Sequence, residues 1–252
     1  MALDLNDKTA NSNTLTNSGA VEVTTSPPFS PNTSMADFES TDPDFMSAAD
    51  SASLSLSTTG TIEFWIKFES LPASGSEMFA ISKPGGFGID YGVTFYNDAG
   101  AMELEGSISN GVDKRDIFKW VFAFTTATWY HIAVSFNSGN GSSTTFVAYI
   151  DTVDKGNGVS IVSQDVVTIA DSANALLIGK KSDNTAYLDG IIDEIRIWNT
   201  VRTGAQISSN YNIELAGSES GLAAYWPYNI IPSPAAGGPS VRGYKTLMGV
   251  GL

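Results

Sequence analysis

The sequence predicts an all-β protein, built as a two-sheet antiparallel sandwich or a barrel, with one short helix. About a dozen short segments alternate apolar with polar residues, which is typical of strands that bury one face. Gly, Asn, Ser and Pro separate these segments at the spacing of hairpins. The only convincing helix signal is short and covers residues 203–211.

The strongest strand signals lie where large apolar residues recur at every second position. They cover residues 61–69, 118–125, 129–136, 145–151 and 188–199. Asn140 and Gly141 can supply the positive φ angles of a hairpin turn between two of them. Weaker signals cover residues 20–24, 45–49, 78–82, 87–96, 101–108, 166–169, 176–179 and 222–226.

The segment 188–199, LDGIIDEIRIWN, is predicted to be a central strand that is covered on both sides. Strict alternation gives one row of Ile191, Asp193, Ile195 and Ile197 and an opposite row of Ile192, Glu194, Arg196 and Trp198. A carboxylate in an aliphatic row needs a partner, because burying an unpaired charge is very costly. Asp193 is therefore a candidate for a structural ligand.

Composition limits the kinds of partner that the chain can have. It has 252 residues, a net charge of −14 and no cysteine. A chain this acidic is not expected to bind the phosphates of nucleic acids, but it can attract cations such as calcium. The lack of cysteine excludes disulfides and thiol chemistry.

The two ends of the chain differ from its middle in composition. Residues 1–34 are rich in Asn, Ser, Thr and Pro, and we expect an extension with one strand that joins the sandwich. The N-terminus has neither a basic nor an apolar region, so no secretory signal is expected, and no run is long and apolar enough to insert in a membrane. Residues 230–252 carry Arg242 and Lys245 and no acidic residue. This Gly/Pro-rich segment is either a floppy terminus or a basic arm that docks on an acidic neighbour.

Four stretches occur in the order seen in laminin-G-like (concanavalin A-like) jelly-roll domains. They read DFESTDPDFMSAADSASLSLSTTGTIEFWIKF, WYHIAVSF, FVAYIDTV and LLIGKKSDNTAYLDGIIDEIRIWNTVRT. The resemblance implies a jelly-roll sandwich of two antiparallel sheets over residues 35–229. Members of this family are mostly non-catalytic modules for glycan binding, adhesion or assembly, although the fold also hosts glucanases.

The residues do not favour catalysis. The acid pattern E-x-D-x-x-E of glucanases with this fold is missing, and its nearest imitation is Glu103 and Glu105 on one strand face. Nothing near them in sequence resembles a sugar cleft, so a solvated strand edge is the expected setting. His131 is the only histidine, and no G-x-S-x-G element accompanies it. We therefore expect a protein that is not an enzyme.

Calcium is the expected cofactor, if there is one. Calcium takes six to eight oxygen ligands, and carboxylates and backbone carbonyls can supply them. By resemblance, Asp193 would occupy a late-strand calcium position and the acidic loop would supply Asp37, Asp42 and Asp44. The alternative is that Asp193 accepts hydrogen bonds from backbone N–H groups or a tyrosine hydroxyl.

Aromatic side chains are the usual platforms for sugars, and the candidates here are Trp65, Tyr91, Tyr96 and Tyr187. Two functions remain open. The chain is either a structural or decoration protein of an extracellular assembly, such as a tailed-phage virion, or a calcium-supported carbohydrate-binding adhesion module of a bacterial surface or secreted protein. Expected partners are other proteins of the assembly, cell-surface glycans and further copies of the chain. The expected location is a virion surface or the extracellular space.

Overall fold

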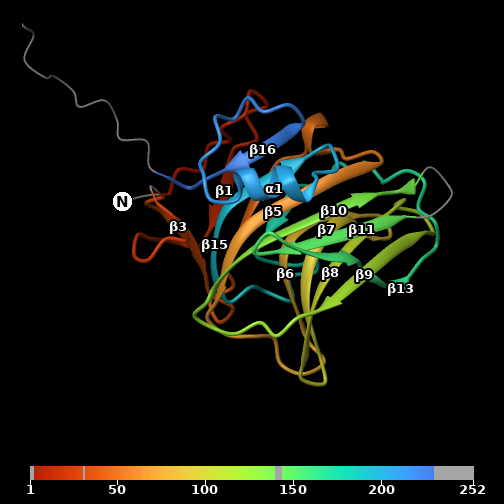
Figure 1. Ribbon diagram of the computed structural model, residues 1–252, viewed down its shortest axis with the longest axis horizontal. Helices are drawn as coiled ribbons and strands as arrows, with labels where there is room; N and C mark the ends of the chain where they lie inside the picture. Colours follow the sequence, from red (N-terminus) through yellow and green to blue (C-terminus); the bar gives the residue numbers. More distant parts are fainter. Residues whose placement is uncertain (1–2, 31, 140–143, 230–252) are drawn as a thin grey trace, which may run out of the picture.

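The protein is described by a computed structural model that covers residues 3–30, 32–139 and 144–229. Two antiparallel sheets pack face to face around one apolar core, as the sequence and the resemblance predicted (Figure 1). All strand pairs that carry register are antiparallel, so the architecture is that of a jelly-roll sandwich and not a barrel.

Sheet A holds eight strands. In spatial order they are β1 (Leu15–Ser18), β4 (Phe45–Ala48), β14 (Leu176–Ile178), β6 (Glu77–Gly85), β7 (Gly88–Asp98), β8 (Ala101–Ser109), β9 (Arg115–Val121) and β13 (Val159–Val162). The strands β6 to β9 follow one another in sequence and form a long meander. This meander is the broad middle of sheet A.

Sheet B also holds eight strands. In spatial order they are β12 (Val153–Asn157), β11 (Thr145–Ile150), β10 (Trp129–Asn137), β5 (Thr59–Phe68), β15 (Gly190–Trp198), β3 (Met35–Phe38) and β2 (Val21–Val23), and β16 (Leu222–Trp226) pairs with β15 as well. The segment predicted as a central strand is therefore central, because β15 is paired along both edges.

The residues 3–34 belong to both sheets. The predicted strand at 20–24 is β2 of sheet B, and a second strand, β1, joins sheet A. The expectation of one strand was thus too low. The predicted strand at 166–169 does not form, since the N–H of Val166 donates to the side chain of Asp116 and not to a neighbouring strand.

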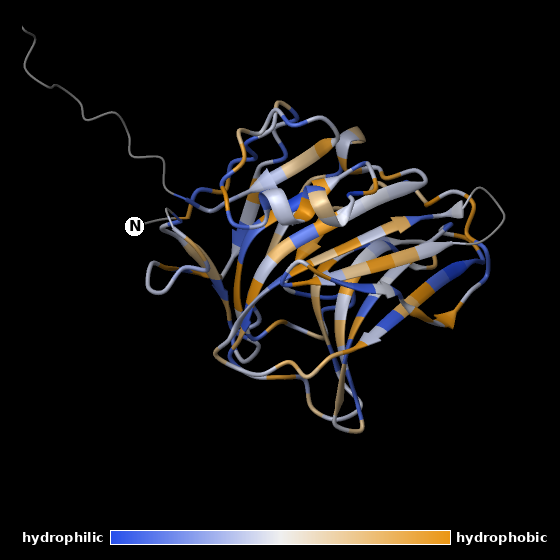
Figure 2. Ribbon diagram, viewed as in Figure 1, coloured by the Kyte–Doolittle hydropathy of each residue, from blue (hydrophilic) through white to orange (hydrophobic). Residues whose placement is uncertain are grey.

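The core lies between the sheets and is rich in phenylalanine. Phe64 and Phe68 of β5 meet Phe95 of β7 edge to face, and Phe124 completes this group with centroid distances of 4.8 to 6.5 Å. Figure 2 shows the alternation of apolar and polar residues along the strands that sends one row of side chains inward. The side chains that point outward from the two sheets are therefore the ones available for binding.

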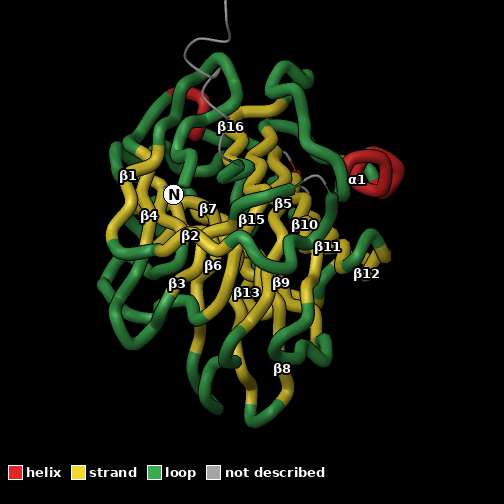
Figure 3. Tube along the Cα trace, turned by 90° about the vertical axis from the view of Figure 1, so that its left-hand side faces the viewer, coloured by secondary structure: helices red, strands yellow, loops and turns green. Residues whose placement is uncertain are grey.

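The short helix α1 (Gly204–Asn210) covers the outer face of sheet B (Figure 3). A capping box begins it, in which Thr203 and Gln206 exchange hydrogen bonds. Its one buried residue, Ile207, packs on Ala133 of β10 and Tyr149 of β11. The outer face of sheet A has no such helix among the described residues.

A β-bulge in β15 changes the predicted faces of that strand. Asp193 lies opposite Trp65, and Arg196 lies opposite Glu63, so two residues of β15 face one residue of β5. Glu194 has a positive φ of 54° at this point. The side chains of Ile192, Ile195 and Ile197 consequently enter the core, and the prediction that Asp193 shares a row with Ile195 and Ile197 was wrong.

Candidate functional site

A groove of about 220 Å³ lies on the outer face of sheet A, over the meander. We call it the sheet-A groove. It is lined by Glu77, Phe79, Ser82, Phe87, Gly88, Ile89, Thr94, Glu105, Ser107, Arg115, Ile117 and Lys181. These residues come from the four neighbouring strands β6 to β9, the turn between β6 and β7, and the loop after β14, so the groove crosses the strands.

Alternation along the strands explains why these side chains point outward. On β7, Val93 and Phe95 enter the core, so Thr94 between them faces the groove. On β8, Leu104 enters the core and Glu105 faces outward, directly opposite Thr94. Next to Glu105, Gly106 faces inward, where a Cβ atom would meet Phe146 of sheet B at 2.8 Å. This close packing of the sheets keeps β8 rigid under the groove.

The floor of the groove offers hydroxyl groups, and its walls are apolar. Within the described residues, the hydroxyls of Ser82, Thr94 and Ser107 make no hydrogen bond. The walls consist of Phe79, Phe87, Ile89 and Ile117. Free hydroxyls between apolar walls are the chemistry that binds a sugar, which also combines hydroxyl groups with apolar C–H faces.

Two of the three glutamates around the groove are neutralised by lysines. Lys181 binds Glu77 with an Nζ–Oε1 distance of 2.8 Å, and Lys119 binds Glu103 at 2.5 Å. Within the part of the chain that the structure describes, Glu105 has no such cation, although Lys119 lies opposite it in register.

Burial, with smaller contributions from the charges of Glu103 and Glu77, raises the pKa of Glu105 to about 7, although the charge of Lys119 acts in the opposite direction. The expectation of a solvated strand edge around Glu103 and Glu105 was therefore wrong. Strand β8 lies between β7 and β9, and its Glu105 faces a groove with aromatic walls.

The four aromatic residues proposed as sugar platforms do not form one cluster. Tyr91 is fully buried, and its hydroxyl donates to the carbonyl of Leu54 at 2.8 Å, so its ring has no exposed face. Trp65 is 7 % exposed and lies on the other sheet. Tyr187 is half-buried in the loop before β15. Only Tyr96 is near the groove, half-buried and opposite Glu77 in register.

Trp65 belongs to an aromatic cluster under the segment that follows α1. Its indole N–H donates to the carbonyl of Tyr211 at 2.8 Å, and its ring lies 5.3 Å from that of His131 and 6.5 Å from that of Trp129. Burial and the charge of Arg196 lower the pKa of His131 to about 3, so this histidine is neutral near pH 7. It packs as part of the structure.

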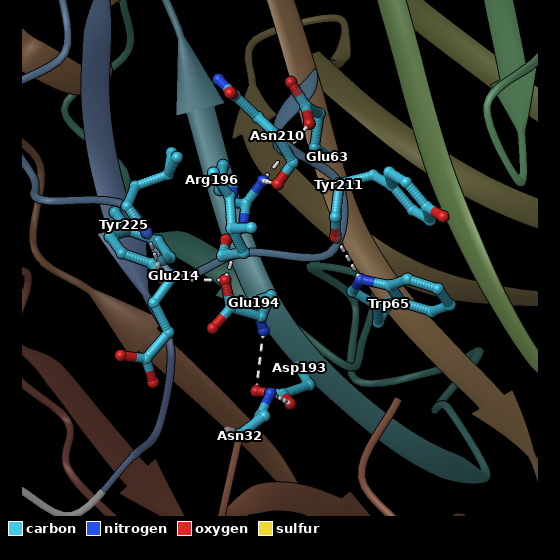
Figure 4. A network of polar contacts seen from close by, with 12 residues as sticks. Asn32, Glu63, Trp65, Asp193, Glu194, Arg196, Asn210, Tyr211, Glu214 and Tyr225 are labelled. Carbon is cyan, nitrogen blue, oxygen red and sulfur yellow. Dashed lines mark hydrogen bonds and ion pairs between the residues drawn. The ribbon is translucent and has the colours of Figure 1, made fainter. Parts of the chain in front are cut away.

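Asp193 is buried, and its carboxylate accepts two hydrogen bonds (Figure 4). The amide of Asn32 donates to Oδ2, and the backbone N–H of Glu194 donates to Oδ1 at 2.8 Å. These contacts agree with the expectation that Asp193 accepts hydrogen bonds from backbone N–H groups. The additional donor is an asparagine amide and not a tyrosine hydroxyl.

The same face of sheet B holds a buried ionic network (Figure 4). The guanidinium of Arg196 donates to Glu194 at 2.7 Å and to the carbonyls of Asn210 and Ile213 at 2.8 and 2.7 Å. The hydroxyl of Tyr225 donates to Glu194 at 2.7 Å. This network ties β15 and β16 to the segment that follows α1.

A different set of acids meets near the start of β15. Carboxylate oxygens of Asp37, Glu39 and Glu69 lie within 4.8 Å of one another, and we call these residues the acidic trio. Burial is the first cause that raises the pKa of each, and repulsion between neighbouring acids adds to it. The Oδ1 atom of Asp37 is buried without a hydrogen-bond partner in the described structure.

The remaining residues predicted to hold calcium lie near the acidic trio and not in it. Asp42 is exposed, and Asp44 accepts from the N–H of Glu39 at 3.2 Å. The trio nevertheless fits a hard cation, because three carboxylates converge and one of their oxygens lacks a donor. Arg242 and Lys245, predicted as a docking arm, lie outside the described residues.

The family model of the concanavalin A-like lectin/glucanases superfamily matches residues 41–208. The chain belongs to this superfamily. No curated protein matches it. The superfamily and its lectin-like β-sandwich fold are therefore established.

Solved structures share the superfamily fold at low sequence identity. Domain 4 of a GH43 extracellular arabinanase from Geobacillus stearothermophilus, in complex with arabinotriose, has a TM-score of 0.54 and 15 % identity over 82 % of this chain and 97 % of that one. The tailspike protein 2 of bacteriophage CBA120 has a TM-score of 0.60 and 10 % identity over 90 % of this chain and 34 % of that one. The binding domain of botulinum neurotoxin serotype G has a TM-score of 0.59 and 12 % identity over 80 % of this chain and 46 % of that one.

These likenesses show the fold alone. This chain spans nearly all of the arabinanase domain but less than half of the tailspike and neurotoxin chains. Among the residues that the structure describes, no helix is long and apolar enough to cross a membrane.

Sequence reasoning missed most of the groove. Glu105 was noticed, but Thr94, Ser107 and Arg115 were not. The available signal was the alternation of polar with core residues in three consecutive strands, 87–96, 101–108 and 118–125. That pattern indicates an outer face with polar side chains, although it does not show which strands are neighbours.

Proposed function

We propose that the chain is a non-enzymatic carbohydrate-binding module and that the sheet-A groove holds the glycan. The observation that carries the proposal is the groove itself, with its free hydroxyls, its apolar walls and the unpaired Glu105. The superfamily fold supports it. The neutral state of the only histidine and the lysine-paired Glu77 and Glu103 support binding without catalysis.

A glycan array tests the proposal, with affinities of hits measured by calorimetry. Thr94→Val and Ser107→Ala remove hydroxyls from the groove without changing its charge, and each is expected to weaken binding about fivefold to tenfold, because a hydrogen bond contributes about 1 kcal/mol. Ser160→Ala is the matched control, since Ser160 is exposed on the edge strand β13 outside the groove. Equal affinities for all three variants and the wild type would place the glycan elsewhere.

We also propose a setting for this binding, namely the outside of a tailed-phage virion, where the chain would be a decoration or fibre-associated protein. The acidic body and the basic segment 230–252 support an assembly through contacts between copies or with other virion proteins. A bacterial surface or secreted adhesion module is the alternative setting. Antibody labelling separates the two, because the chain should be found on purified particles in the first case and on uninfected cells in the second.

We propose a second ligand, a structural calcium ion held by the acidic trio. The support is the orphaned Oδ1 atom of Asp37 and the mutual repulsion of the three carboxylates, which a divalent cation would relieve. Calcium should raise the melting temperature of the wild type, and Glu69→Gln should remove this rise. Asp42→Asn is the matched control, because Asp42 is an exposed acid of the same loop outside the trio. An equal calcium effect in both variants would contradict the site.

A further inference from the structure

The charges around the sheet-A groove leave one carboxyl group without a counter-ion. Glu77 of β6 is bound by Lys181, and Glu103 of β8 is bound by Lys119 of β9. Glu105 lies two residues after Glu103 on the same face of β8, opposite Thr94 of β7 and Lys119 of β9, and no described cation is bonded to it. The groove therefore presents two neutralised acids and one acid that still needs a partner.

The remaining cation of the groove is at its rim. Arg115 lies 5.8 Å from the ring centroid of Phe87 and faces Ser109 in the β8–β9 register. Glu105 faces Lys119 in the same register, four residues further along the strand, which is a distance of about 13 Å. Arg115 thus stays away from Glu105, and Lys119 is bonded to Glu103, so neither cation forms an ion pair with Glu105.

We infer that the sheet-A groove selects a glycan that carries a free primary amine, with the ammonium group against the carboxylate of Glu105. This inference rests on the proposed function and names its ligand class. The hydroxyls of Thr94, opposite Glu105 on β7, and of Ser107, two residues after it on β8, bind hydroxyls of the same sugar. Phe79 and Phe87 supply apolar walls, and each ring already has a cation of the protein near it, Lys181 at 5.7 Å and Arg115 at 5.8 Å.

The charge state of Glu105 agrees with this ligand. Burial and the neighbouring acids hold its pKa at about 7, so the free groove keeps a proton on this group about half of the time at neutral pH. A ligand ammonium stabilises the ionised form and lowers the pKa, and the proton goes to solvent. A neutral sugar has no charge that stabilises the ionised form of Glu105. When such a sugar is bound, Glu105 must either keep its proton or remain a carboxylate without a counter-ion.

Calorimetry at about pH 7 with a glucosamine oligosaccharide and its N-acetylated counterpart tests the inference. The wild type should bind the amine form about tenfold more tightly, since a hydrogen bond to a charged group contributes more than a neutral one. Glu105→Gln should lose this preference and still bind the N-acetylated form, which shows that the variant is folded. Asp113→Asn is the matched control, because it makes the same change in net charge on an exposed turn outside the groove.

The outcomes separate the inference from the proposed function. Equal affinity of the wild type for both oligosaccharides, or a preference that survives in Glu105→Gln, overturns the amine inference and leaves glycan binding in place. The amine inference is also overturned if the protein binds a glycan without an amine and does not bind the glucosamine oligosaccharide. Failure to bind any glycan overturns both. A carboxyl NMR titration adds a direct readout, because the pKa of Glu105 should fall below about 7 when the amine form is bound.

Discussion

Three glutamates on one face of sheet A have different neighbours. Glu77 and Glu103 each have a lysine Nζ atom within 2.8 Å of a carboxylate oxygen. Glu105 has none and is partly desolvated, so it exchanges a proton near pH 7. A single position in β8 thus sets the charge of the groove.

Glu105 makes the stability of the protein depend on pH. Its folded pKa of about 7 is above the usual 4.5, so its contribution to stability is full below about pH 4.5 and is lost as the pH rises through about 7. Glu105→Gln removes this loss. At about pH 8 the variant should be more stable than the wild type by about 1–2 kcal/mol, which allows for solvent screening, and at about pH 4 the two should be equal. Urea unfolding at both values measures the difference, and a variant that is less stable at the higher pH would contradict the assignment.

Asp193 is expected to stabilise the fold without calcium. Asp193→Ala leaves the amide of Asn32 and the N–H of Glu194 without an acceptor inside the protein. The free energy of unfolding should fall by about 2–4 kcal/mol, because two buried donors lose their partner. Thermal unfolding with calcium and with a chelator should show the same loss in both conditions. A loss of stability that appears only in the presence of calcium would indicate that Asp193 is a metal ligand.

At the scale of elements, the bulge in β15 decides what lies on each face of sheet B. One extra residue at Glu194 keeps Ile195 and Ile197 in the core and places Arg196 on the outer face, where the segment after α1 supplies carbonyl acceptors. Without the bulge, Arg196 would point into the apolar core. The buried ionic network therefore depends on a local backbone feature.

Two changes at Glu194 separate the backbone feature from the side chain. Deleting Glu194 removes the bulge and restores regular alternation, so Ile195 and Ile197 should stay in the core, Arg196 should stay on the outer face, and the variant should still unfold cooperatively. Glu194→Gln keeps the bulge and removes one charge of the ion pair with Arg196, which should cost about 3 kcal/mol of stability and leave a folded protein. Near-ultraviolet circular dichroism on heating measures both, and loss of the cooperative transition in the deletion variant would contradict the argument.

Alternation predicted the elements well and their neighbours poorly. The apolar period of segment 188–199 is visible in the sequence. Glu194, however, is not a glycine, so its positive φ and the bulge that it causes could not be predicted. The residues 101–108 show that Glu103 and Glu105 share a face, but not that β7 and β9 flank them. Phe79, Arg115 and Lys181 meet at the groove across about a hundred residues of sequence, and only the sheet order brings them together.

At the scale of the whole molecule, the two sheets divide the work. Sheet B carries α1 and the segment after it on its outer face, so its buried charges serve stability. Sheet A leaves its outer face open over β6 to β9, and the groove lies there. The superfamily motifs predicted the sandwich because they lie on strands of the core, whereas the groove depends on outward residues that those motifs do not include.

The whole-molecule prediction concerns residues 230–252, which we propose to be a basic arm that docks on an acidic neighbour. The described fold is complete without them, since the hydrogen bonds of Asn229 to Thr33 and Ser34 hold the chain after β16. A protein that ends at Asn229 should keep its melting temperature and its glycan affinity. Its assembly should be lost, because the arm carries Arg242 and Lys245 and the rest of the chain is strongly acidic. Light scattering of both forms at low and high salt measures this, with Arg242→Gln plus Lys245→Gln as the variant of equal length. Assembly that survives truncation, or that is unaffected by both charge removal and salt, would exclude the arm as the docking element.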